Sequence, residues 1–579
     1  MLTTIQKMSM LAAAAISAAT LAQPARVALV EIEGTPPETA GAASLFAPET
    51  PSTLRQLTTL IADAGNRDLD GLVVRLKDSA LSLPQAEEIA AAIDAAQEDG
   101  VLVHVFGTFY GPTDLVVAAS ADEVLIQDGG GVSLPGLAIE QIYWADAFEW
   151  MGISADYVQV GDYKGAQDPY VRSGPSPEWD RNISSLLDAQ YANLREPLKE
   201  GFGLSDRRLD RAMERLFMAD AKTAIEVGMV DAAVDLPVLF ESYLAESAYD
   251  DFDGVEYAGT LAPDDASTLD TSNPFAIFSQ LFEPPTRRTF GPTIAVLHIN
   301  GAIMDGESGG SLLGGQSVGS RTIRNAIEEI LRDDNIEGIV VRIDSPGGSA
   351  TASEIIWQGL RRASERKPVY VSVGSIAASG GYYILAGGDK VYVNPSSMVG
   401  SIGVVAGKLG FGEVLDRLEI NVVTRTRGPR AGLMTMFSDW GEDDLKFLRG
   451  QIAETYEQFT DRVKRGRPGV DLDEVAAGRV FVGSDAVELG MADELGGLRD
   501  AIGDLAEELD LDEYAVMDFP APPGLDQLLG GGLGLPGIEM AKRVLGERRF
   551  ATLAPFIEAW GLMRDRPVVL VAPGALVGR

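Results

Sequence analysis

The sequence predicts an α/β protein built from two tandem copies of one domain, each with a mainly parallel sheet. Short runs such as residues 338–343 (GIVVRI) are continuously apolar, as in strands buried on both faces. These runs alternate with helical patterns, which favours a parallel sheet covered by helices. A chain of 579 residues is also too long for one hydrophobic core, so two or more domains are expected.

Four apolar segments recur at one fixed spacing of 267 residues, without gaps. The matched segments are 26–34 with 293–301, 71–76 with 338–343, 100–107 with 367–374, and 119–126 with 386–393. Four chance matches at the same spacing are improbable, so the chain contains an internal duplication.

Each copy reads as strand, helix, strand, helix. Helices are expected in residues 84–100 of the first copy and 350–367 of the second. The second has one apolar stripe and ends before Pro368. The stripe consists of Ile355, Ile356, Leu360 and Ala363.

The N-terminus has the pattern of an export signal. Lys7 precedes roughly 15 apolar or small residues, and cleavage is expected after Ala22. The run is short for a spanning helix, which needs about 20 residues, so signal peptide and membrane anchor both remain open. The expected divisions are a signal or anchor at 1–22, domains at 23–257 and 292–519, a linker at 258–291, and an extension of unknown role at 520–579.

Composition excludes several classes of function. With 47 basic and 86 acidic residues the net charge is −39, which argues against a nucleic-acid partner. The absence of cysteine excludes a thiolate nucleophile and a cysteine-ligated zinc. The only histidines, His104 and His298, lie in strand-like runs and are expected to be packed residues. No cofactor or metal is called for, and a hydrolase would need Lys, Asp or Glu as its base.

The two copies differ at two chemically important positions. Ser379 stands where a strand hands over to a helix, and its counterpart at the repeat spacing is Pro112. Lys164 lies between two glycines that also occur in the second copy, where its counterpart is Ala431. Each copy therefore supplies one group that the other lacks, and we expect Ser379 and Lys164 to form one active centre across the domain interface within one chain.

The chemistry sets conditions on this pair. A serine hydroxyl needs a neighbouring base, and a lysine acts as one only when neutral. Because an ordinary lysine has a pKa of roughly 10.4, burial between the two domains must lower it. Ser401 is the candidate for orienting the amine.

An oxyanion formed during acyl transfer also needs hydrogen-bond donors. The backbone N–H of Gly380 is expected at the start of the helix after Ser379. Gly347 and Gly348, in a turn after a buried strand, are a second expected source, and their backbone also suits pairing with an extended peptide.

Four segments carry a resemblance to a known family. These are SIAASGGYY, NPSSMVGSIGV, RIDSPGGSATASE and GDYKGAQDPYVR. They resemble the signal peptide peptidase A (protease IV) type of the S49 family of serine peptidases, in its long tandem-repeat form. The resemblance covers about residues 26–510, and it omits the tail after 520.

The resemblance implies a ClpP/crotonase-like fold in each copy and a Ser-Lys dyad. It makes Ser379 the nucleophile, Lys164 the general base and Ser401 the lysine-orienting residue, and it places Gly380 in the oxyanion hole. It also implies a homotetramer at the cytoplasmic membrane that faces the periplasm and degrades hydrophobic signal peptides. The short, Ala-rich N-terminal segment departs from a firm membrane anchor, so a soluble periplasmic form is the alternative.

Two other functions fit part of the sequence. A crotonase-type acyl-CoA enzyme would share the fold and the glycine-rich oxyanion hole, but it would not need Ser379 or Lys164. A non-catalytic scaffold that binds peptides would need neither group to be reactive. Labelling by a fluorophosphonate distinguishes these functions from a peptidase, because only an activated serine reacts.

Overall fold

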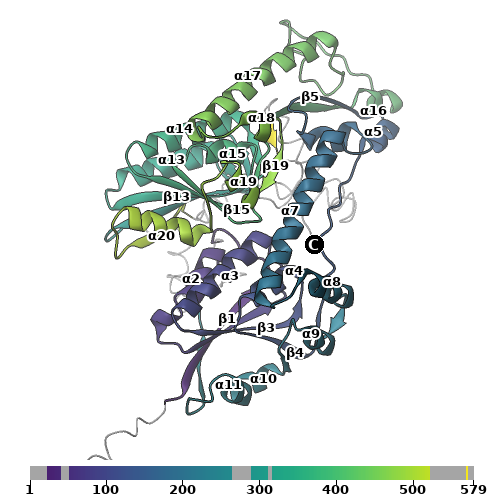
Figure 1. Cartoon of the computed structure of the whole chain (residues 1–579). Coiled ribbons are helices and arrows are strands. Elements are labelled where there is room, and N and C mark those ends of the chain that lie inside the picture. The colour runs from purple at the N-terminus through teal and green to yellow at the C-terminus, as the bar shows by residue number, and fades with distance from the viewer. Residues whose placement is uncertain (1–22, 41–50, 264–288, 311–315, 522–568, 572–579) are drawn as a thin grey trace, which may run out of the picture.

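The computed structural model describes residues 23–40, 51–263, 289–310, 316–521 and 569–571. The expected signal or anchor at 1–22 lies outside the described residues, as does most of the linker and of the C-terminal extension. Each half of the chain builds one sheet with helices packed on it, and the halves lie against each other (Figure 1). Among the described residues, no helix has the length and apolar character required to span a bilayer.

The first half contains a seven-stranded sheet in the order β6-β4-β3-β2-β1-β8, with β7 beside β4. All its pairs are parallel except β4 with β6. Its strands are β1 Ala25–Glu33, β2 Gly71–Lys77, β3 Leu102–Tyr110, β4 Glu123–Val132, β6 Ala219–Asp220, β7 Ala232–Val234 and β8 Val255–Thr260.

The second half repeats this arrangement in the order β19-β17-β15-β13-β9-β21, with β16 beside β15 and β20 beside β16. Its strands are β9 Thr293–Asn300, β13 Ile336–Ser345, β15 Val369–Ala378, β16 Lys390–Val393, β17 Met398–Gly400, β19 Val480–Val482, β20 Glu494–Leu495 and β21 Ala515–Phe519. Both sheets bury apolar side chains on both faces, which is why their strands read as continuous apolar runs.

The strand pairing repeats between the halves. Val27 lies opposite Gly71 in the first sheet, and Ile294 lies opposite Gly338 in the second, each residue 267 positions later. The duplication predicted from sequence is therefore visible in the hydrogen-bond register.

The repeat is not gapless, so that part of the prediction is wrong. Leu72 pairs with Val103, but its counterpart Ile339 pairs with Val369 where an unbroken spacing would require Tyr370. The one-residue shift puts the valine on the same face of the sheet in both copies and Tyr370 on the opposite face. Side chains alternate between the two faces along a strand. Without the shift, Tyr370 and the valines of this strand would therefore exchange faces.

Helices cover both sheets, and several begin at side-chain caps. Ser82 starts α3 with a capping box to Gln85, and Ser349 caps α14. The first-half helices are α2 Leu54–Ala62, α3 Leu83–Glu98, α4 Pro112–Ala119, α5 Ala145–Met151, α6 Asp168–Val171, α7 Pro177–Gly201, α8 Asp206–Arg215, α9 Ala221–Val227, α10 Leu236–Val238 and α11 Leu244–Ser247, with shorter turns at Gly65–Arg67, Gly165–Gln167 and Leu239–Tyr243. The second-half helices are α13 Ser320–Arg332, α14 Ala350–Ser364, α15 Gly380–Leu385, α16 Gly412–Arg417, α17 Glu442–Gly466, α18 Leu472–Val475, α19 Gly483–Glu488 and α20 Leu498–Glu508.

A third sheet joins the two halves, in the order β11-β12-β10-β14-β22-β18-β5. β5 comes from the first half, and the other strands come from the second half and the C-terminal segment. They are β5 Ser154–Val160, β10 Ala302–Met304, β11 Gly309–Gly310, β12 Gln316–Gly319, β14 Gly347–Ser349, β18 Val404–Gly410 and β22 Val569–Val571.

The long helix α7 extends from the first half toward the second (Figure 1). There Trp179 and Leu186 pack against Val480 and Val482 of β19, and Asn182 exchanges hydrogen bonds with the backbone of Val480. This packing fixes the relative position of the halves.

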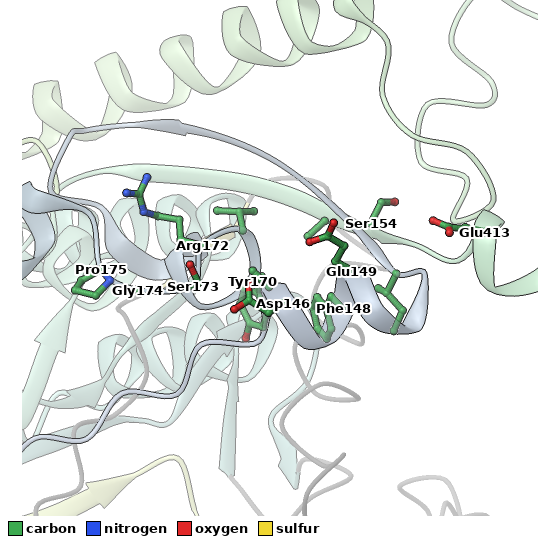
Figure 2. A pocket seen from close by; sticks show the side chains of 14 residues that line it. Asp146, Phe148, Glu149, Ser154, Tyr170, Arg172, Ser173, Gly174, Pro175 and Glu413 are labelled. Atoms are coloured by element: carbon green, nitrogen blue, oxygen red, sulfur yellow. The ribbon is translucent and has the colours of Figure 1, made fainter.

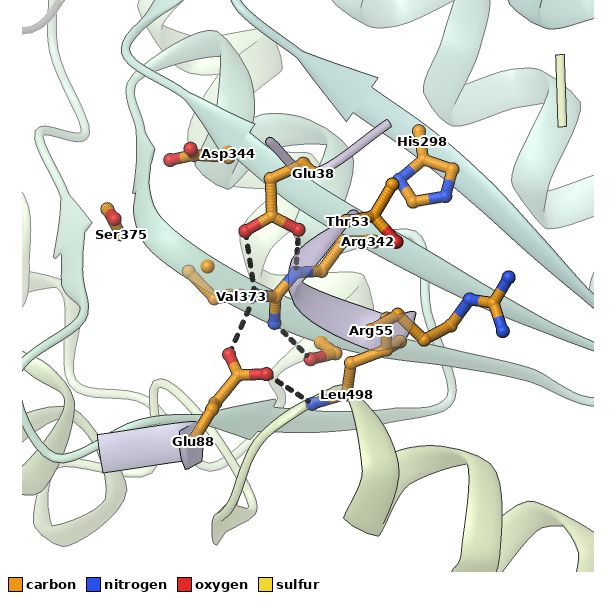
Figure 3. Close-up of polar contacts among 12 residues, drawn as sticks. Glu38, Thr53, Arg55, Glu88, His298, Arg342, Asp344, Val373, Ser375 and Leu498 are labelled. Carbon is orange, nitrogen blue, oxygen red and sulfur yellow. Dashed lines mark hydrogen bonds and ion pairs between the residues drawn. The ribbon is translucent and has the colours of Figure 1, made fainter. Parts of the chain in front are cut away.

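A buried ionic cluster also links the halves (Figure 3). Arg342 on β13 is 1% exposed and donates to Glu38 at 2.9 Å from two nitrogens, and to Glu88 at 2.7 Å. Both carboxylates belong to the first half. Burial opposes ionisation of both, but Arg342 outweighs it at Glu38, whose pKa is lowered, whereas the pKa of Glu88 is raised.

Candidate active site

Ser379 lies at the junction of β15 and α15, as the sequence predicts. It is the N-cap residue of α15 and has φ +53°, a left-handed conformation that is uncommon for a residue with a side chain. Its N–H donates to Gly400 O at 2.8 Å. A positive φ at a residue with a side chain strains the backbone, and local strain of this kind is typical of functional sites.

Lys164 follows β5, and its amine reaches the serine across the interface. Its Nζ donates to Ser379 Oγ at 2.9 Å, to Ser401 Oγ at 2.9 Å and to the backbone oxygen of Ser401 at 2.9 Å. The three contacts match the three N–H groups of a charged lysine; in the neutral amine, two N–H groups remain and the lone pair can accept the hydrogen bond of the Ser379 hydroxyl. The structure therefore brings together all three of the side chains expected in the active centre.

Burial is the main electrostatic influence on this lysine. Lys164, Ser379 and Ser401 are each 0% exposed. Burial lowers the pKa of Lys164 well below its ordinary value, and within the described part of the chain no carboxylate offsets this by stabilising the charged form. The amine is thus held in conditions that favour its neutral, proton-accepting form.

Residues 477–479 contribute to the site, and the sequence reasoning missed them. The N–H of Tyr163 donates to Ala477 O at 2.9 Å, and the N–H of Ser401 donates to Arg479 O at 2.5 Å. Gly478 has φ +91°, and a Cβ there would lie 2.5 Å from the backbone nitrogen of Lys164. This segment connects the lysine loop to the Ser401 loop, and nothing in its sequence indicates so distant a contact.

The structure also supports the complementary absence in the two copies. The helix that corresponds to α15 is α4, and its N-cap residue is Gly111, one position before the Pro112 expected from unbroken spacing. Gly111 has no hydroxyl, so the first copy still lacks a nucleophile at this junction.

The glycines expected in the oxyanion hole lie beside Ser379. A Cβ on Gly380 would lie 3.1 Å from Gly348 N and 3.3 Å from Gly347 Cα, so the two backbones are in close contact. The N–H of Gly347 donates to Ser345 Oγ at 3.2 Å and is already used. Both Gly347 and Gly348 belong to β14, which pairs antiparallel with the C-terminal strand β22.

The histidines are packed strand residues, as expected. His104 lies within hydrogen-bonding distance of Glu123 and Tyr249, and His298 within that of Asp518. Neither contacts Ser379. Among the residues that the structure describes, no three His, Cys, Asp or Glu side chains are placed to hold a metal ion.

A separate pocket opens near α5 (Figure 2). Its volume is about 850 Å³, and its walls come from residues 145–155, residues 170–175 and Glu413 of α16. Ser379, Lys164 and Ser401 are not among its lining residues. This pocket therefore lies apart from the candidate active centre.

Comparison with protein families decides the identity. The model of peptidase family S49 matches residues 102–242 and 361–512, which together make up about half of the chain, and a Clp protease model matches residues 313–400. The chain belongs to peptidase family S49. The two S49 matches fall in the two halves, which confirms a duplicated ClpP/crotonase-like fold and a serine peptidase.

Relatives agree with this family. Protease 4 of Haemophilus influenzae is 27% identical over 471 residues, which are 78% of this chain and 72% of that protein. The chloroplastic serine protease SPPA of Arabidopsis thaliana is 26% identical over 427 residues, which are 72% of this chain and 60% of that protein. An Enterococcus faecium relative named after signal peptide peptidase SppA is 30% identical over 231 residues, 39% of this chain and 66% of its own. The tandem form of the S49 family thus accounts for most of this chain.

Proposed function

We propose that this S49 peptidase is an endopeptidase that uses a Ser-Lys dyad, with Ser379 as nucleophile and Lys164 as general base. The observation that carries the proposal is the 2.9 Å contact between Lys164 Nζ and Ser379 Oγ at a fully buried position. A neutral amine at this distance is within proton-transfer reach of the hydroxyl.

The reaction proceeds by acyl transfer. Ser379 Oγ attacks the scissile carbonyl carbon while its proton passes to Lys164 Nζ. The tetrahedral intermediate collapses, the lysine gives that proton to the departing amine, and an ester to Ser379 remains. Water, deprotonated by the same lysine, then hydrolyses the ester and restores the hydroxyl. Ser401 accepts a hydrogen bond from the amine and keeps it directed at Ser379.

The oxyanion is stabilised by backbone donors beside the nucleophile. Gly380 N–H at the start of α15 is the first donor, and Gly348 N–H is the second. Gly347 is not used as a donor in this proposal, because its N–H already donates to Ser345 Oγ.

The substrate binds as an extended strand between β14 and β18. The C-terminal strand β22 lies in this position, antiparallel to both: Leu570 is opposite Gly348, and Val569 is opposite Val405. Main-chain pairing on both sides provides affinity without selecting a side chain. The C-terminal run of residues 568–572 (VVLVA) has the apolar composition expected of the substrates, and in the intact chain it competes with them.

The physiological substrates are hydrophobic signal peptides that remain after preprotein processing. The name of the Enterococcus faecium relative, the apolar sequence of the bound tail and the export signal support this proposal. The enzyme acts in the periplasm, either attached to the cytoplasmic membrane through residues 1–22 or soluble after cleavage behind Ala22. N-terminal sequencing of the protein from fractionated cells tests this, because a start at Gln23 in the soluble fraction excludes the anchored form.

The active form is a homo-oligomer, expected to be a tetramer. Sedimentation or light scattering of the purified protein measures this directly, and a 61.5 kDa species would exclude it.

The deciding experiment compares wild type with Ser379→Ala and Lys164→Met. Hydrolysis of a fluorogenic apolar peptide and labelling by a fluorophosphonate are measured on each. Wild type is expected to label and cleave, and Ser379→Ala to do neither. A wild-type protein that does not label at any pH, or cleavage that persists in Ser379→Ala, would overturn the proposal.

A further inference from the structure

The joint between the two halves is built on one strand pair. β5 of the first half runs antiparallel to β18 of the second over seven residues, from Val160 opposite Val404 to Ser154 opposite Gly410. This pair places Lys164, just after β5, beside Ser401, just before β18.

Each half also contains the repeat counterpart of the strand that the other half contributes. The counterpart of β18 is residues 137–143, and the counterpart of β5 is residues 421–427, both at the spacing of 267.

Backbone hydrogen bonds around these segments support the equivalence. The N–H of Trp144 donates to Pro169 O, and the N–H of Phe411 donates to Met436 O, both at 2.6 Å and both 267 positions apart. The N–H of Ile153 bonds to Phe148 O as that of Ile420 bonds to Leu415 O, each at 2.8 Å. The two copies therefore share local backbone hydrogen bonds in residues 144–153 and 411–420, which follow residues 137–143 in the first copy and precede residues 421–427 in the second.

In this chain, both counterpart segments are unpaired. Neither forms a helix or a strand, and among the described residues neither makes a backbone–backbone hydrogen bond. They also expose large apolar side chains: Ile142 is 65% exposed, Val422 43% and Val423 71%. Backbone without strand partners that exposes apolar side chains is a template for pairing with another chain.

We propose that residues 421–427 of one copy pair antiparallel with residues 137–143 of a second copy, and that this joint repeats the β5–β18 joint between chains. This inference rests on the proposed homo-oligomer. The repeat fixes the register. In an antiparallel pair the residue numbers of opposed residues have a constant sum, and this sum is unchanged when 267 is added to the numbers of β5 and subtracted from those of β18. The expected pairs are Leu137 with Arg427, Ile139 with Arg425, Glu140 with Thr424, Gln141 with Val423, Ile142 with Val422 and Tyr143 with Asn421.

The joint is heterologous, so it joins copies head to tail and generates a closed ring where the rotation between copies permits. Within each ring, the joints inside chains and the joints between chains alternate.

The proposal accounts for the absence of a catalytic serine from the first copy and of a catalytic lysine from the second. At a joint between chains, the position of Lys164 is taken by Ala431, that of Ser401 by Leu134 and that of Ser379 by Gly111. The joint keeps the shape of the active centre but has neither amine nor hydroxyl. Each chain therefore contains one complete active centre. It also contributes one side of two further joints, which lack the catalytic groups.

Disulfide cross-linking tests the register, and the absence of native cysteine makes any link unambiguous. Opposed residues in an antiparallel pair have Cα atoms about 4.5–5.5 Å apart, within the roughly 4.4–6.8 Å that a disulfide spans. The full-length Ile142→Cys/Val422→Cys variant is expected to give, after mild oxidation, a reducible ladder that ends at the ring size on a denaturing gel.

Matched variants make the result specific. Glu140→Cys/Thr424→Cys, in register, is expected to link, whereas Ile142→Cys/Thr426→Cys, four positions out of register, is expected to link at least tenfold more slowly. Each single variant is expected to remain unlinked. An oligomer that gives no in-register link, or a Val422→Cys single variant that links to itself, would overturn the joint.

A second measurement separates this proposal from the proposed function. Val422→Lys adds a charge at an exposed position, so the subunit folds, and it is expected to sediment as a monomer that still labels with fluorophosphonate. If the wild type does not label but the cysteine variants still cross-link, only the proposed peptidase mechanism is contradicted. If the wild type is monomeric, the proposed oligomer and the joint between chains are contradicted, and the mechanism is not.

Discussion

Lys164 Nζ lies 2.9 Å from Ser379 Oγ, although the two residues are 215 positions apart and belong to different halves of a duplicated chain. Neither half contains both groups. The centre exists because the β5–β18 pair and the segment at 477–479 hold the lysine loop against the serine junction. Activity should therefore depend on both halves and on the protonation of one buried amine.

Lys164→Met replaces the amine with an apolar side chain of similar length. We expect a loss of kcat/KM of about 10²–10⁴, the usual contribution of a general base, with the fold retained. Peptide hydrolysis measures the loss. Lys408→Met is the matched control, because Lys408 on β18 is also buried with a lowered pKa but donates to backbone oxygens away from Ser379. Equal losses in the two variants would contradict the assignment.

The pH dependence of activity should follow the ionisation of Lys164. Because burial lowers its pKa, kcat/KM is expected to rise with pH through a single ionisation below the ordinary lysine value of 10.5. In the interval between the folded and unfolded pKa values, the unfolded chain binds the extra proton, so the free energy of unfolding also rises with pH. Both slopes are measured against Lys164→Met, which should show neither; an identical stability profile would refute the lowered pKa.

Ser401→Ala removes one acceptor of the lysine but leaves the backbone oxygen of Ser401 in place. We expect kcat to fall about tenfold to a hundredfold, KM to change little and the pH midpoint of kcat/KM to move. A purely structural role would lower the melting temperature and leave the pH midpoint unchanged. Steady-state kinetics across pH, with a thermal melt, distinguishes these results.

Removal of the C-terminal segment should open the strand position between β14 and β18. A variant ending at Ala521 is expected to have a KM for apolar peptides at least tenfold lower than wild type, since a tethered competitor acts at about millimolar effective concentration. Leu570→Pro in the full-length chain, which removes a strand N–H, should have the same direction. A synthetic peptide of residues 565–575 should inhibit the truncated enzyme. Unchanged KM in both variants would show that the tail does not compete with substrate.

Arg342→Met leaves Glu38 and Glu88 buried without their cation. We expect the free energy of unfolding to fall by about 3–5 kcal/mol, as when one partner of a buried ion pair is removed. Denaturant unfolding at pH 7 measures it. The triple variant with Glu38→Gln and Glu88→Gln, which removes all three charges, should recover most of the loss. If Arg342→Met is neutral, the cluster does not join the halves.

The sequence was sufficient for the fold class, the duplication and the candidate residues of the centre. Apolar runs such as 338–343 carry their periodicity locally, and a base other than histidine followed from composition, since only His104 and His298 are present. Ser379 and Lys164 could be singled out because neither has an equivalent serine or lysine in the other copy.

Tertiary structure alone decided the rest, because contacts between distant segments leave no local signal. The one-residue shift of β15 follows from which face each valine must bury, and the Ala477–Arg479 support and the third hydrogen bond of Lys164 follow from how the halves dock. The position of β22 between β14 and β18 likewise depends on a strand edge left open by the fold. The sequence determined which groups are present, whereas the packing of the two halves determined that they meet in one water-excluded place where the amine can act as a base.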